Sequence, residues 1–291
     1  MKNIIAFCIA AAIFSLSLPA MAGSSSKKDI ALQLYSLRGD IKKDYDSTIK
    51  KVGEMGYTSI EAAGYKDGKF YGRTPEEFKK DIEENGMKVL SSHTHRPLSA
   101  AELKSGTFSD ETMRWWDQCI AAHKAAGMKY LAFPWMKKPE NLRDLKTYCN
   151  YLNEIGRRCK EAGIEFCYHN HSFEFDKIEN KLMYDFMLEN TDPKYVGFEM
   201  DVYWVVMGKQ SPVEYFEKYP GRFKLLHIKD RKELGESGMV GFDAIFKHIG
   251  KAGAKYIVVE VERYSFEPEV SVKKSIEYLQ DAPFVKPSYS E

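Results

Sequence analysis

The sequence lacks the motifs that would assign several common classes of protein. It has no CxxC pair, no GxGxxG loop after its first predicted strand and no glycine-rich phosphate cradle. Lysine and arginine exceed aspartate and glutamate by only one charge, whereas a nucleic-acid-binding protein usually carries a basic patch. Beyond the N-terminus there is no apolar run of membrane-spanning length, so no membrane anchor is expected. These absences disfavour a dinucleotide-binding sheet, a nucleic-acid partner and a membrane protein.

The first 22 residues have the pattern of a secretory signal peptide. Lys2 supplies the positive charge, residues 4–18 form the apolar core, and Ala20-Met21-Ala22 is a small-residue cleavage site. Cleavage after Ala22 leaves 269 of the 291 residues, a length that suits one large domain over residues 23–291. A periplasmic or secreted location is therefore expected.

Cysteine is scarce and irregularly spaced in the predicted mature chain. Cys119, Cys149 and Cys159 lie in helix-like segments, and Cys167 lies in a strand-like run. Export permits disulfides, but this placement predicts buried free thiols.

A repeated cadence runs through the chain and predicts its architecture. Helix-like stretches end in glycine and a strand-like run follows at once, as in ENGMKVLSSH (84–93) and EAGIEFCYH (161–169). Eight strands are predicted, at Ile30–Tyr35, Thr58–Ala62, Lys88–His93, Tyr130–Pro134, Glu165–His169, Gly197–Asp201, Lys224–Ile228 and Tyr256–Val261. Eight strand–helix units predict an α/β fold, a single-domain (β/α)8 TIM barrel with its active site at the strand C-termini. An open doubly wound sheet is the alternative.

Histidines gather where a barrel would place its active site. His93, His95, His169, His171 and His227 lie at predicted strand ends, and only His123 and His248 lie in helices. Because side chains alternate along a strand, His169 and His171 share a face. The set predicts a metal or catalytic site, although each histidine taken alone is better explained as a hydrogen-bonding core or pocket residue.

Acidic residues follow the same pattern, with Glu61, Asp201 and Glu260 each interrupting an apolar strand. A buried carboxylate needs a partner, either a lysine or arginine or a shared cation. Imidazole and carboxylate together suit Mn, Co, Zn, Fe or Ni. We therefore expect one divalent metal ion whose identity stays open.

Aromatic and basic residues complete the predicted rim. Tyr35, Trp135 and Trp204 would stack on the apolar faces of a sugar, and Lys229 would polarise a substrate oxygen. The alternatives are ordinary rim packing and a solvated lysine.

These motifs resemble the xylose isomerase-like TIM-barrel superfamily of sugar phosphate isomerases and epimerases, related to endonuclease IV. The resemblance covers nearly the whole mature chain and rests on LQLYS (32–36), Glu61, YHNHSFEF (168–175), MDVYW (200–204), LLHIKD (225–230) and VVEVE (258–262). The resemblance implies one metal held by Asp201, His227 and Glu260, with His169 where ketose 3-epimerases have a first glutamate. The chain also departs from their Asp-x-x-His element, since Trp204 follows Asp201 at that spacing.

The resemblance also implies roles for the remaining residues. Glu260, or Glu262 on the same face, would be the base, Lys229 or His171 would polarise the carbonyl, and Glu174 would replace the missing glutamate. Substrate-binding positions would be Tyr35, Glu61, His93, His95, Trp135 and Trp204.

Three functions stay open at this point. The first is metal-dependent isomerisation or epimerisation of a non-phosphorylated sugar, starting with proton abstraction next to a carbonyl. The second is β-elimination from a 3-keto-glycoside by a lyase or hydratase, and the third is non-catalytic sugar binding. Export and near-neutral charge argue against a phosphorylated substrate and against an endonuclease. Monomer and homo-oligomer are equally compatible with the sequence.

Overall fold

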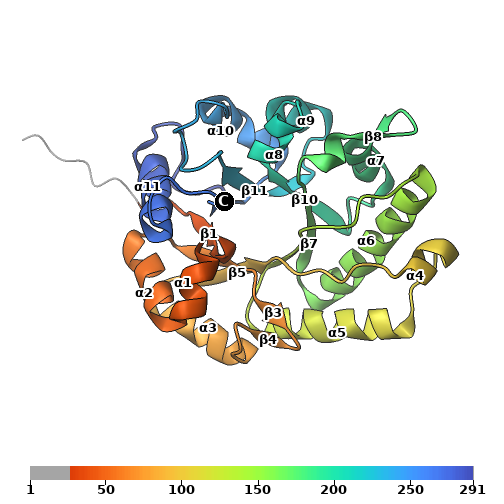
Figure 1. Cartoon of the computed structure of the whole chain (residues 1–291), viewed down its shortest axis with the longest axis horizontal. Helices are drawn as coiled ribbons and strands as arrows, with labels where there is room; N and C mark the ends of the chain where they lie inside the picture. Colours follow the sequence, from red (N-terminus) through yellow and green to blue (C-terminus); the bar gives the residue numbers. More distant parts are fainter. Residues whose placement is uncertain (1–26, 291) are drawn as a thin grey trace, which may run out of the picture.

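The computed structural model describes residues 27–290, so the predicted signal peptide lies outside the described residues. Eight parallel strands form the central sheet: β1 (Ala31–Gln33), β2 (Ser59–Ala62), β5 (Lys88–Ser92), β6 (Tyr130–Phe133), β7 (Glu165–His169), β10 (Val196–Asp201), β11 (Phe223–Lys229) and β12 (Tyr256–Glu260). Their order is β5-β2-β1-β12-β11-β10-β7-β6, with the helices arranged around them (Figure 1).

The two outer strands of this order, β5 and β6, also meet. His93 and Ala132 form a parallel bridge, and Thr94 N–H donates to the Ala132 carbonyl at 3.0 Å. Lys129 N–H donates to the Leu90 carbonyl at the same distance lower in the pair. These contacts close the sheet and confirm the predicted (β/α)8 barrel over an open doubly wound sheet.

The helices follow the predicted alternation with the strands. They are α1 (Arg38–Lys43), α2 (Tyr45–Met55), α3 (Pro75–Glu84), α4 (Ala100–Ser105), α5 (Asp110–Ala125), α6 (Leu142–Ala162), α7 (Met183–Asn190), α8 (Val202–Met207), α9 (Pro212–Lys218), α10 (Phe242–Ala252) and α11 (Pro268–Asp281). Short 3-10 turns η1 (Leu34–Leu37) and η2 (Phe173–Phe175) follow β1 and β7. Two small hairpins, β3 (Tyr65–Lys66) with β4 (Lys69–Phe70) and β8 (Lys177–Ile178) with β9 (Lys181–Leu182), were not predicted.

Local sequence explains where the helices begin and end. Thr74 and Glu77 form a reciprocal capping box at the start of α3, with Pro75 at the first helical position. Gly163 ends α6 and Gly253 ends α10, with φ angles of 85° and 82° that only glycine adopts cheaply. Each glycine turns the chain directly into the next strand.

Apolar packing fills the barrel below its mouth and the layer between barrel and helices. Inside the barrel, a buried apolar group closes the lower part: Ala31, Leu90, Tyr130, Ala132, Cys167, Leu225 and Val258. Between barrel and helices, Trp116 of α5 is fully buried, and its Nε1–H donates to Tyr151 Oη of α6 at 2.6 Å. The polar residues of the barrel interior are thereby confined to its upper end.

Cys119, Cys149, Cys159 and Cys167 are free and buried, which confirms the prediction of free thiols. Within residues 27–290, no helix combines the length and apolarity needed to cross a bilayer.

Candidate active site

The register of the sheet places most of the predicted site residues in pairs on adjacent strands. Glu199 of β10 pairs with His169 of β7, and Asp201, two residues further on, pairs with His227 of β11. Lys229, two residues after His227, pairs with Glu260 of β12. Residues two apart share a face of a strand, so all of these side chains point into the barrel. From β7 to β12, the paired residues lie progressively nearer the C-terminal ends of the strands.

Asp201, His227 and Glu260 form one group that is able to hold a metal ion. All three are buried, and one ligand atom from each lies within 4.8 Å of the others. Asp201 caps α8, because its Oδ1 accepts a hydrogen bond from Trp204 N–H at 2.9 Å. Within residues 27–290, its other oxygen, Oδ2, and His227 Nδ1 are buried without hydrogen-bond partners, and His227 Nδ1 lies 3.6 Å from Glu260 Oε2. Three of the four predicted ligands, Asp201, His227 and Glu260, therefore converge. Asp201 and His227 each have one polar atom without a hydrogen bond within residues 27–290.

The fourth predicted ligand, His169, belongs to a second group that shares His227 with the first. This group is His93, His169, Glu199 and His227. His169 Nδ1 lies 3.3 Å from Glu199 Oε2 and makes no hydrogen bond. His93 Nε2 lies 2.7 Å from the same glutamate oxygen.

Glu61 contacts both groups through His227 and His93 and fixes the orientation of His227. Glu61 Oε1 is 2.7 Å from His227 Nε2 and also accepts from Gln33 Nε2–H at 2.8 Å. Ser91 Oγ–H donates to Oε2 at 2.6 Å. Burial alone would raise the pKa of Glu61, but His93 and His227 hold it well below its usual range. His227 thus donates Nε2–H to a carboxylate, an orientation common among metal-binding histidines, and directs Nδ1 towards Glu260.

Asp201 and Glu199 are less completely compensated than Glu61. Burial raises the pKa of Asp201 to about 7, against the lowering effect of Lys229 and His227. Burial and the neighbouring Glu61 raise the pKa of Glu199 to about 7. His169, whose pKa burial and the neighbouring His227 and His93 hold well below the usual value, is a neutral imidazole. Burial would lower the pKa of His227, but Glu199 and Glu61 raise it well above its usual value. Metals bind ionised carboxylates and neutral imidazoles, so a divalent cation held here would displace protons from Asp201 and His227.

Glu260 has a protein partner as well. Lys229 Nζ donates to Glu260 Oε2 at 2.8 Å and also contacts the Glu262 carboxylate. Burial would lower the pKa of Lys229, but Glu260 and Asp201 raise it above its usual value. Lys229 is therefore a buried ammonium ion rather than a solvated lysine, and it lies 5.1 Å from the Trp204 ring centre.

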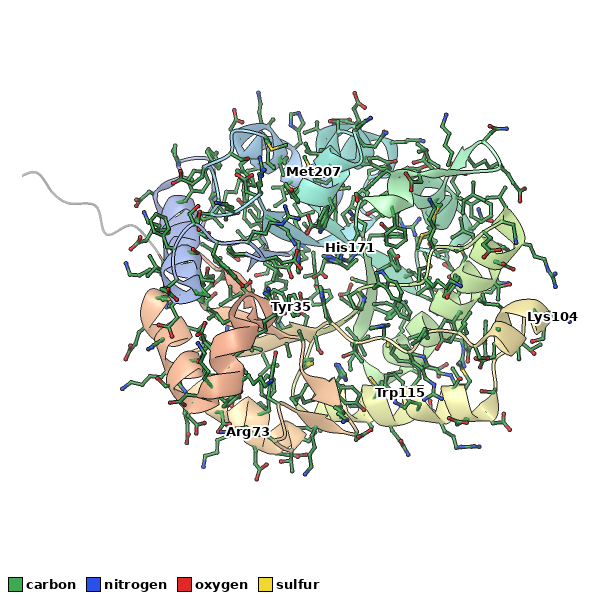
Figure 2. The ribbon with its side chains drawn as sticks, in the orientation of Figure 1. Tyr35, Arg73, Lys104, Trp115, His171 and Met207 are labelled. Atoms are coloured by element: carbon green, nitrogen blue, oxygen red, sulfur yellow. The ribbon has the colours of Figure 1, made fainter. Side chains whose placement is uncertain are left out.

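His171 and Trp204 lie together above this ion pair. Their ring centres are 5.7 Å apart, and His171 Nδ1 and Trp204 Nε1 have no partner within residues 27–290. Burial, together with Lys229, lowers the pKa of His171 to about 4, so its imidazole is neutral near pH 7. Figure 2 shows His171 near the centre of the barrel.

The Glu174 carboxylate is hydrogen-bonded outside the candidate metal group. Its Oε1 accepts from Tyr168 Oη–H at 2.7 Å and its Oε2 accepts from His171 N–H at 2.9 Å. Tyr168 precedes His169 and faces the layer outside the barrel, against Phe133 and Phe198. Burial raises the pKa of Glu174 to about 8. In this structure the carboxyl group fixes the turn after β7 and is not grouped with the candidate ligands.

Apart from Trp204, which lies beside His171, the predicted sugar-binding residues fall into two sets. Tyr35 and Trp135 are 43% and 44% exposed, and His95 is exposed with its ring 6.1 Å from that of Trp135, so these three are available at the rim. Glu61 and His93 instead contact each other inside the barrel, where His93 Nε2 lies 3.0 Å from Glu61 Oε1. Burial would lower the pKa of His93, but Glu61 and Glu199 raise it to about 10.

Four polar residues of the site were absent from the predicted set: Gln33, Ser91, Asn170 and Glu199. Asn170 Oδ1 accepts from Asp201 N–H at 3.1 Å and from Tyr184 Oη–H at 3.2 Å, which holds the end of β10 in place. Glu199 shares a strand face with Asp201, and that alternation was its signal in the sequence. Gln33, Ser91 and Asn170 have no comparable signal, because neutral polar residues near strand ends are common.

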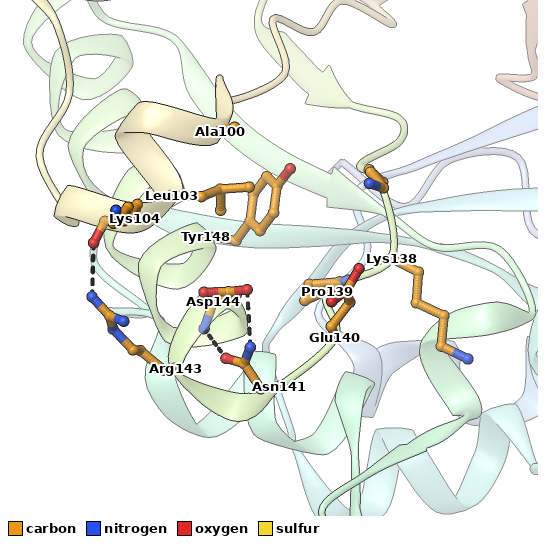
Figure 3. Close-up of a pocket in the computed structure, with 11 residues that line it drawn as sticks. Ala100, Leu103, Lys104, Lys138, Pro139, Glu140, Asn141, Arg143, Asp144 and Tyr148 are labelled. Atoms are coloured by element: carbon orange, nitrogen blue, oxygen red, sulfur yellow. Dashed lines mark hydrogen bonds between the residues drawn. The ribbon is translucent and has the colours of Figure 1, made fainter.

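A separate cavity of about 360 Å³ lies between α4 and the start of α6 (Figure 3). Lys104, Arg143 and Tyr148 line it, and none of the predicted site residues does. Figure 2 places Lys104 at the edge of the molecule, away from His171. We assign this cavity no role in the reaction.

Comparison with known proteins identifies relatives of the whole fold. The structure is similar to a sugar phosphate isomerase/epimerase from Parabacteroides distasonis, with 35% identity and a TM-score of 0.83 over 92% of this chain and 100% of that one. It also matches 3-keto-D-glucoside 4-epimerase from E. coli, with 19% identity and a TM-score of 0.67 over 88% of this chain and 100% of the other, a likeness of fold alone.

Among curated sequences, inosose dehydratase from Lacticaseibacillus casei is 24% identical over 161 residues. That match covers 45% of this chain and 53% of the dehydratase, so the chain spans about half the length of this relative. The profile of the xylose isomerase-like TIM barrel family matches residues 49–282. The chain therefore belongs to the xylose isomerase-like TIM barrel family.

Proposed function

We propose that this protein is a metal-dependent enzyme that removes a proton next to the carbonyl of a non-phosphorylated sugar, in an isomerisation or epimerisation. The observation that supports this most is the buried group of Asp201, His227 and Glu260, with Asp201 Oδ2 and His227 Nδ1 left free. The same group is the predicted ligand set, which His169 would complete. A bound divalent cation supplies polarisation of the sugar carbonyl.

The surrounding residues supply charges in the forms that proton abstraction needs. Burial would raise the pKa of Glu260, but Lys229 and His227 hold it well below its usual range, so Glu260 is ionised and able to act as a base. Glu262, on the same strand face, also contacts Lys229 and is the alternative base. Lys229 provides an ammonium donor for a substrate oxygen, and neutral His171 provides an acceptor at Nδ1. A positioned base typically contributes about 10²–10⁴-fold to the rate.

The choice of a non-phosphorylated sugar is part of the proposal. The Parabacteroides relative is named for sugar phosphates. This chain, however, has no glycine-rich phosphate cradle, and its predicted signal peptide implies export, whereas sugar phosphates are mainly cytoplasmic. Aromatic side chains at the rim favour a neutral ring instead.

A second candidate is β-elimination from a 3-keto-glycoside, and two observations favour it. The curated relatives are dehydratases, and Glu174 is held by Tyr168 and His171 N–H rather than directed to the site as a second acid–base group. An epimerase needs a proton carrier on each face of the sugar, whereas an elimination proceeds with one base and an assisted leaving group.

Deuterium exchange separates these reactions. The full chain, saturated in turn with Mn²⁺, Co²⁺ and Zn²⁺, is incubated in D₂O with a free ketose and with methyl 3-keto-β-D-glucoside. Deuterium in recovered ketose together with a new epimer or aldose supports isomerisation or epimerisation. Loss of methanol with an unsaturated keto sugar supports elimination. If no carbon-bound proton exchanges in either sugar, the proposal fails and non-catalytic sugar binding takes its place.

A further inference from the structure

Two cavities lie at the end of the barrel where the strands begin, opposite the candidate active site. One has a volume of about 360 Å³ and lies beside the starts of β7, β10 and β11. The other has a volume of about 310 Å³ and lies beside the starts of β6, β7 and β12. Glu165, the first residue of β7, lines both, so the two cavities adjoin each other. The proposed reaction uses neither of them.

Lysine dominates the charged residues around these cavities. Glu165 is the one acidic residue that lines them, whereas the lining lysines, which we call the lysine face, are Lys129, Lys160, Lys194, Lys224 and Lys255. None of these five forms an ion pair within residues 27–290, while Lys138 and Lys251 elsewhere pair with Asp176 and Glu217. The lysine face therefore holds an excess of four positive charges on a chain whose net charge is only +1.

The sequence explains why lysines gather at this end of the barrel. Lys129 follows Gly127-Met128 and directly precedes β6, and Lys255 follows Gly253-Ala254 and directly precedes β12. Lys224 is the second residue of β11, and its carbonyl accepts from Lys255 N–H at 3.0 Å. Because all strands of a parallel barrel begin at one end, lysines at strand starts meet there.

Contacts across the barrel make the lysine face continuous. Lys129, beside β6, donates from Nζ to Tyr256 Oη of β12 at 2.8 Å. The side chain of Lys224 passes over Gly197 of β10, where a Cβ would approach Lys224 Cγ to 2.5 Å. The glycine thus makes room for this lysine, which links β11 to the neighbouring strand.

The ammonium groups of the larger cavity keep donors for a ligand. Lys160 Nζ donates to the Lys194 carbonyl at 3.2 Å, and Lys224 Nζ donates to the Gly221 carbonyl at 2.8 Å. An ammonium group has three N–H donors, so both lysines have others to offer to the oxygen atoms of an anion. Lys160 and Lys194 lie near one ring, with their nitrogens 6.0 and 5.1 Å from the centre of Tyr195.

The residues around the cavities favour an acidic glycan over other polyanions. A membrane-binding face adds exposed apolar side chains, but the large exposed ones of residues 27–290 line neither cavity: Tyr35, Trp135, Met239, Phe266 and Val270. No arginine lines either cavity, although arginine is the usual choice for recognition of nucleic-acid phosphates and bases. Tyrosines beside ammonium groups suit sugar rings that carry negative charge.

From these observations we propose that the lysine face binds an acidic glycan, a chain of sugar residues that carry carboxylate or sulfate groups. The charge excess and the adjoining cavities support a polyanion, and the choice of a glycan rests on the proposed function, which is sugar chemistry. Binding at this end holds the protein on the polymer and leaves the opposite end of the barrel open to substrate.

Calorimetric titration of the full chain tests the proposal without turnover. The probes are polygalacturonate, dextran sulfate and neutral dextran, each at about 50 and about 500 mM NaCl. We expect at least one acidic polymer to bind and dextran not to bind. The affinity should fall at least about tenfold at the higher salt concentration, because salt screens exposed charges. Whichever acidic polymer binds more tightly identifies the charged group as carboxylate or sulfate.

A triple variant locates the binding surface. Lys160→Gln, Lys194→Gln and Lys224→Gln together remove the positive charge of the larger cavity and should weaken polymer binding at least about tenfold. The matched control loses the same charge elsewhere, from lysines in exposed ion pairs with glutamate: Lys50→Gln, Lys80→Gln and Lys273→Gln. The control should change the affinity by less than about twofold. Circular dichroism checks that both triple variants are folded.

The outcomes separate this surface from the proposed reaction. If neither acidic polymer binds, or if both triple variants weaken binding equally, the lysine face is not a binding surface. A single-stranded DNA oligonucleotide or phosphatidylglycerol vesicles that bind more tightly than both acidic polymers overturn the choice of a glycan. If an acidic polymer binds through the three lysines but no sugar exchanges deuterium, the surface assignment stands and only the proposed reaction fails.

Discussion

Asp201 and His227 are paired residues on adjacent parallel strands, and each keeps one buried polar atom free inside the barrel. The second atom of each is already engaged, Asp201 Oδ1 with Trp204 N–H and His227 Nε2 with Glu61. The free pair therefore points to a ligand supplied from outside the chain.

The first prediction is that the purified protein binds about one divalent transition metal per chain. Chelation should lower the melting temperature, because a ligand that binds only the folded state stabilises it. Asp201→Asn should weaken metal binding while the barrel stays folded, as measured by metal titration and circular dichroism. Asp176→Asn is the control, since Asp176 is exposed and pairs with Lys138. A folded wild-type protein that takes up no metal at millimolar Mn, Co, Ni or Zn would contradict the assignment.

The second prediction separates two histidines on one strand face. His169→Ala should lose metal, because His169 completes the predicted ligand set. His171→Ala should retain metal and lose sugar affinity, because His171 lies beside Trp204 with a free Nδ1. Metal content by elemental analysis and sugar binding by calorimetry give the two readouts. The reverse pattern would place the metal one pleat nearer the rim.

The third prediction concerns Glu61. Glu61→Gln removes the carboxylate that His227 Nε2 contacts and leaves His93 with Glu199 alone. The metal-free protein should therefore lose about 3–5 kcal/mol of unfolding free energy. Metal affinity should fall by about 10–100-fold, because the tautomer of His227 is no longer fixed. Urea unfolding and metal titration measure these effects. Glu269→Gln, which breaks the exposed pair with Lys51, should change stability by less than about 1 kcal/mol.

The fourth prediction is a pH dependence that originates away from the active site. His123 in α5 is fully buried and neutral, with Nδ1–H donating to the Cys119 carbonyl at 2.7 Å and Thr94 Oγ1 3.3 Å from Nε2. Burial lowers its pKa to about 4, whereas an unfolded histidine titrates near 6.5. The unfolded state therefore binds more protons between these values, and stability is lost as the pH falls through this window.

The loss from His123 alone is roughly 3 kcal/mol by pH 4. His123→Phe removes this loss, so between pH 6.5 and 4 its free energy of unfolding should fall by about 3 kcal/mol less than that of the wild type, measured by urea unfolding at each pH. Parallel curves for the two proteins would show that His123 does not titrate as the structure implies.

The strands were predictable because the same sequence pattern recurs, a helix-ending glycine followed directly by an apolar strand. Glycine-ended helices precede β2, β5, β6, β7 and β12, and the predicted strands match these elements to within one or two residues at each end. The convergence of Asp201, His227 and Glu260 followed from the barrel, which brings strand ends to one face. The assignment of these residues as ligands stays a prediction, which the metal experiments test.

Other features depended on geometry that the sequence does not encode locally. Glu174 follows two histidines, as a site carboxylate would, yet Tyr168 on the outer strand face binds it. The depth of Glu61 and His93 depends on the stagger between strands, which sets which side chains meet inside the barrel. The β3–β4 and β8–β9 hairpins are too short to produce an alternating pattern.

The position of β1 has a consequence for how the protein is made. This strand of three residues lies between β2 and β12, and Ala31 pairs with Val258, near the other end of the chain. Contacts of such long sequence separation form late and slow the folding of a domain. During synthesis, Gln33 and Glu61 leave the ribosome long before His227 and Glu260. The site therefore assembles only when nearly the whole chain has been synthesised.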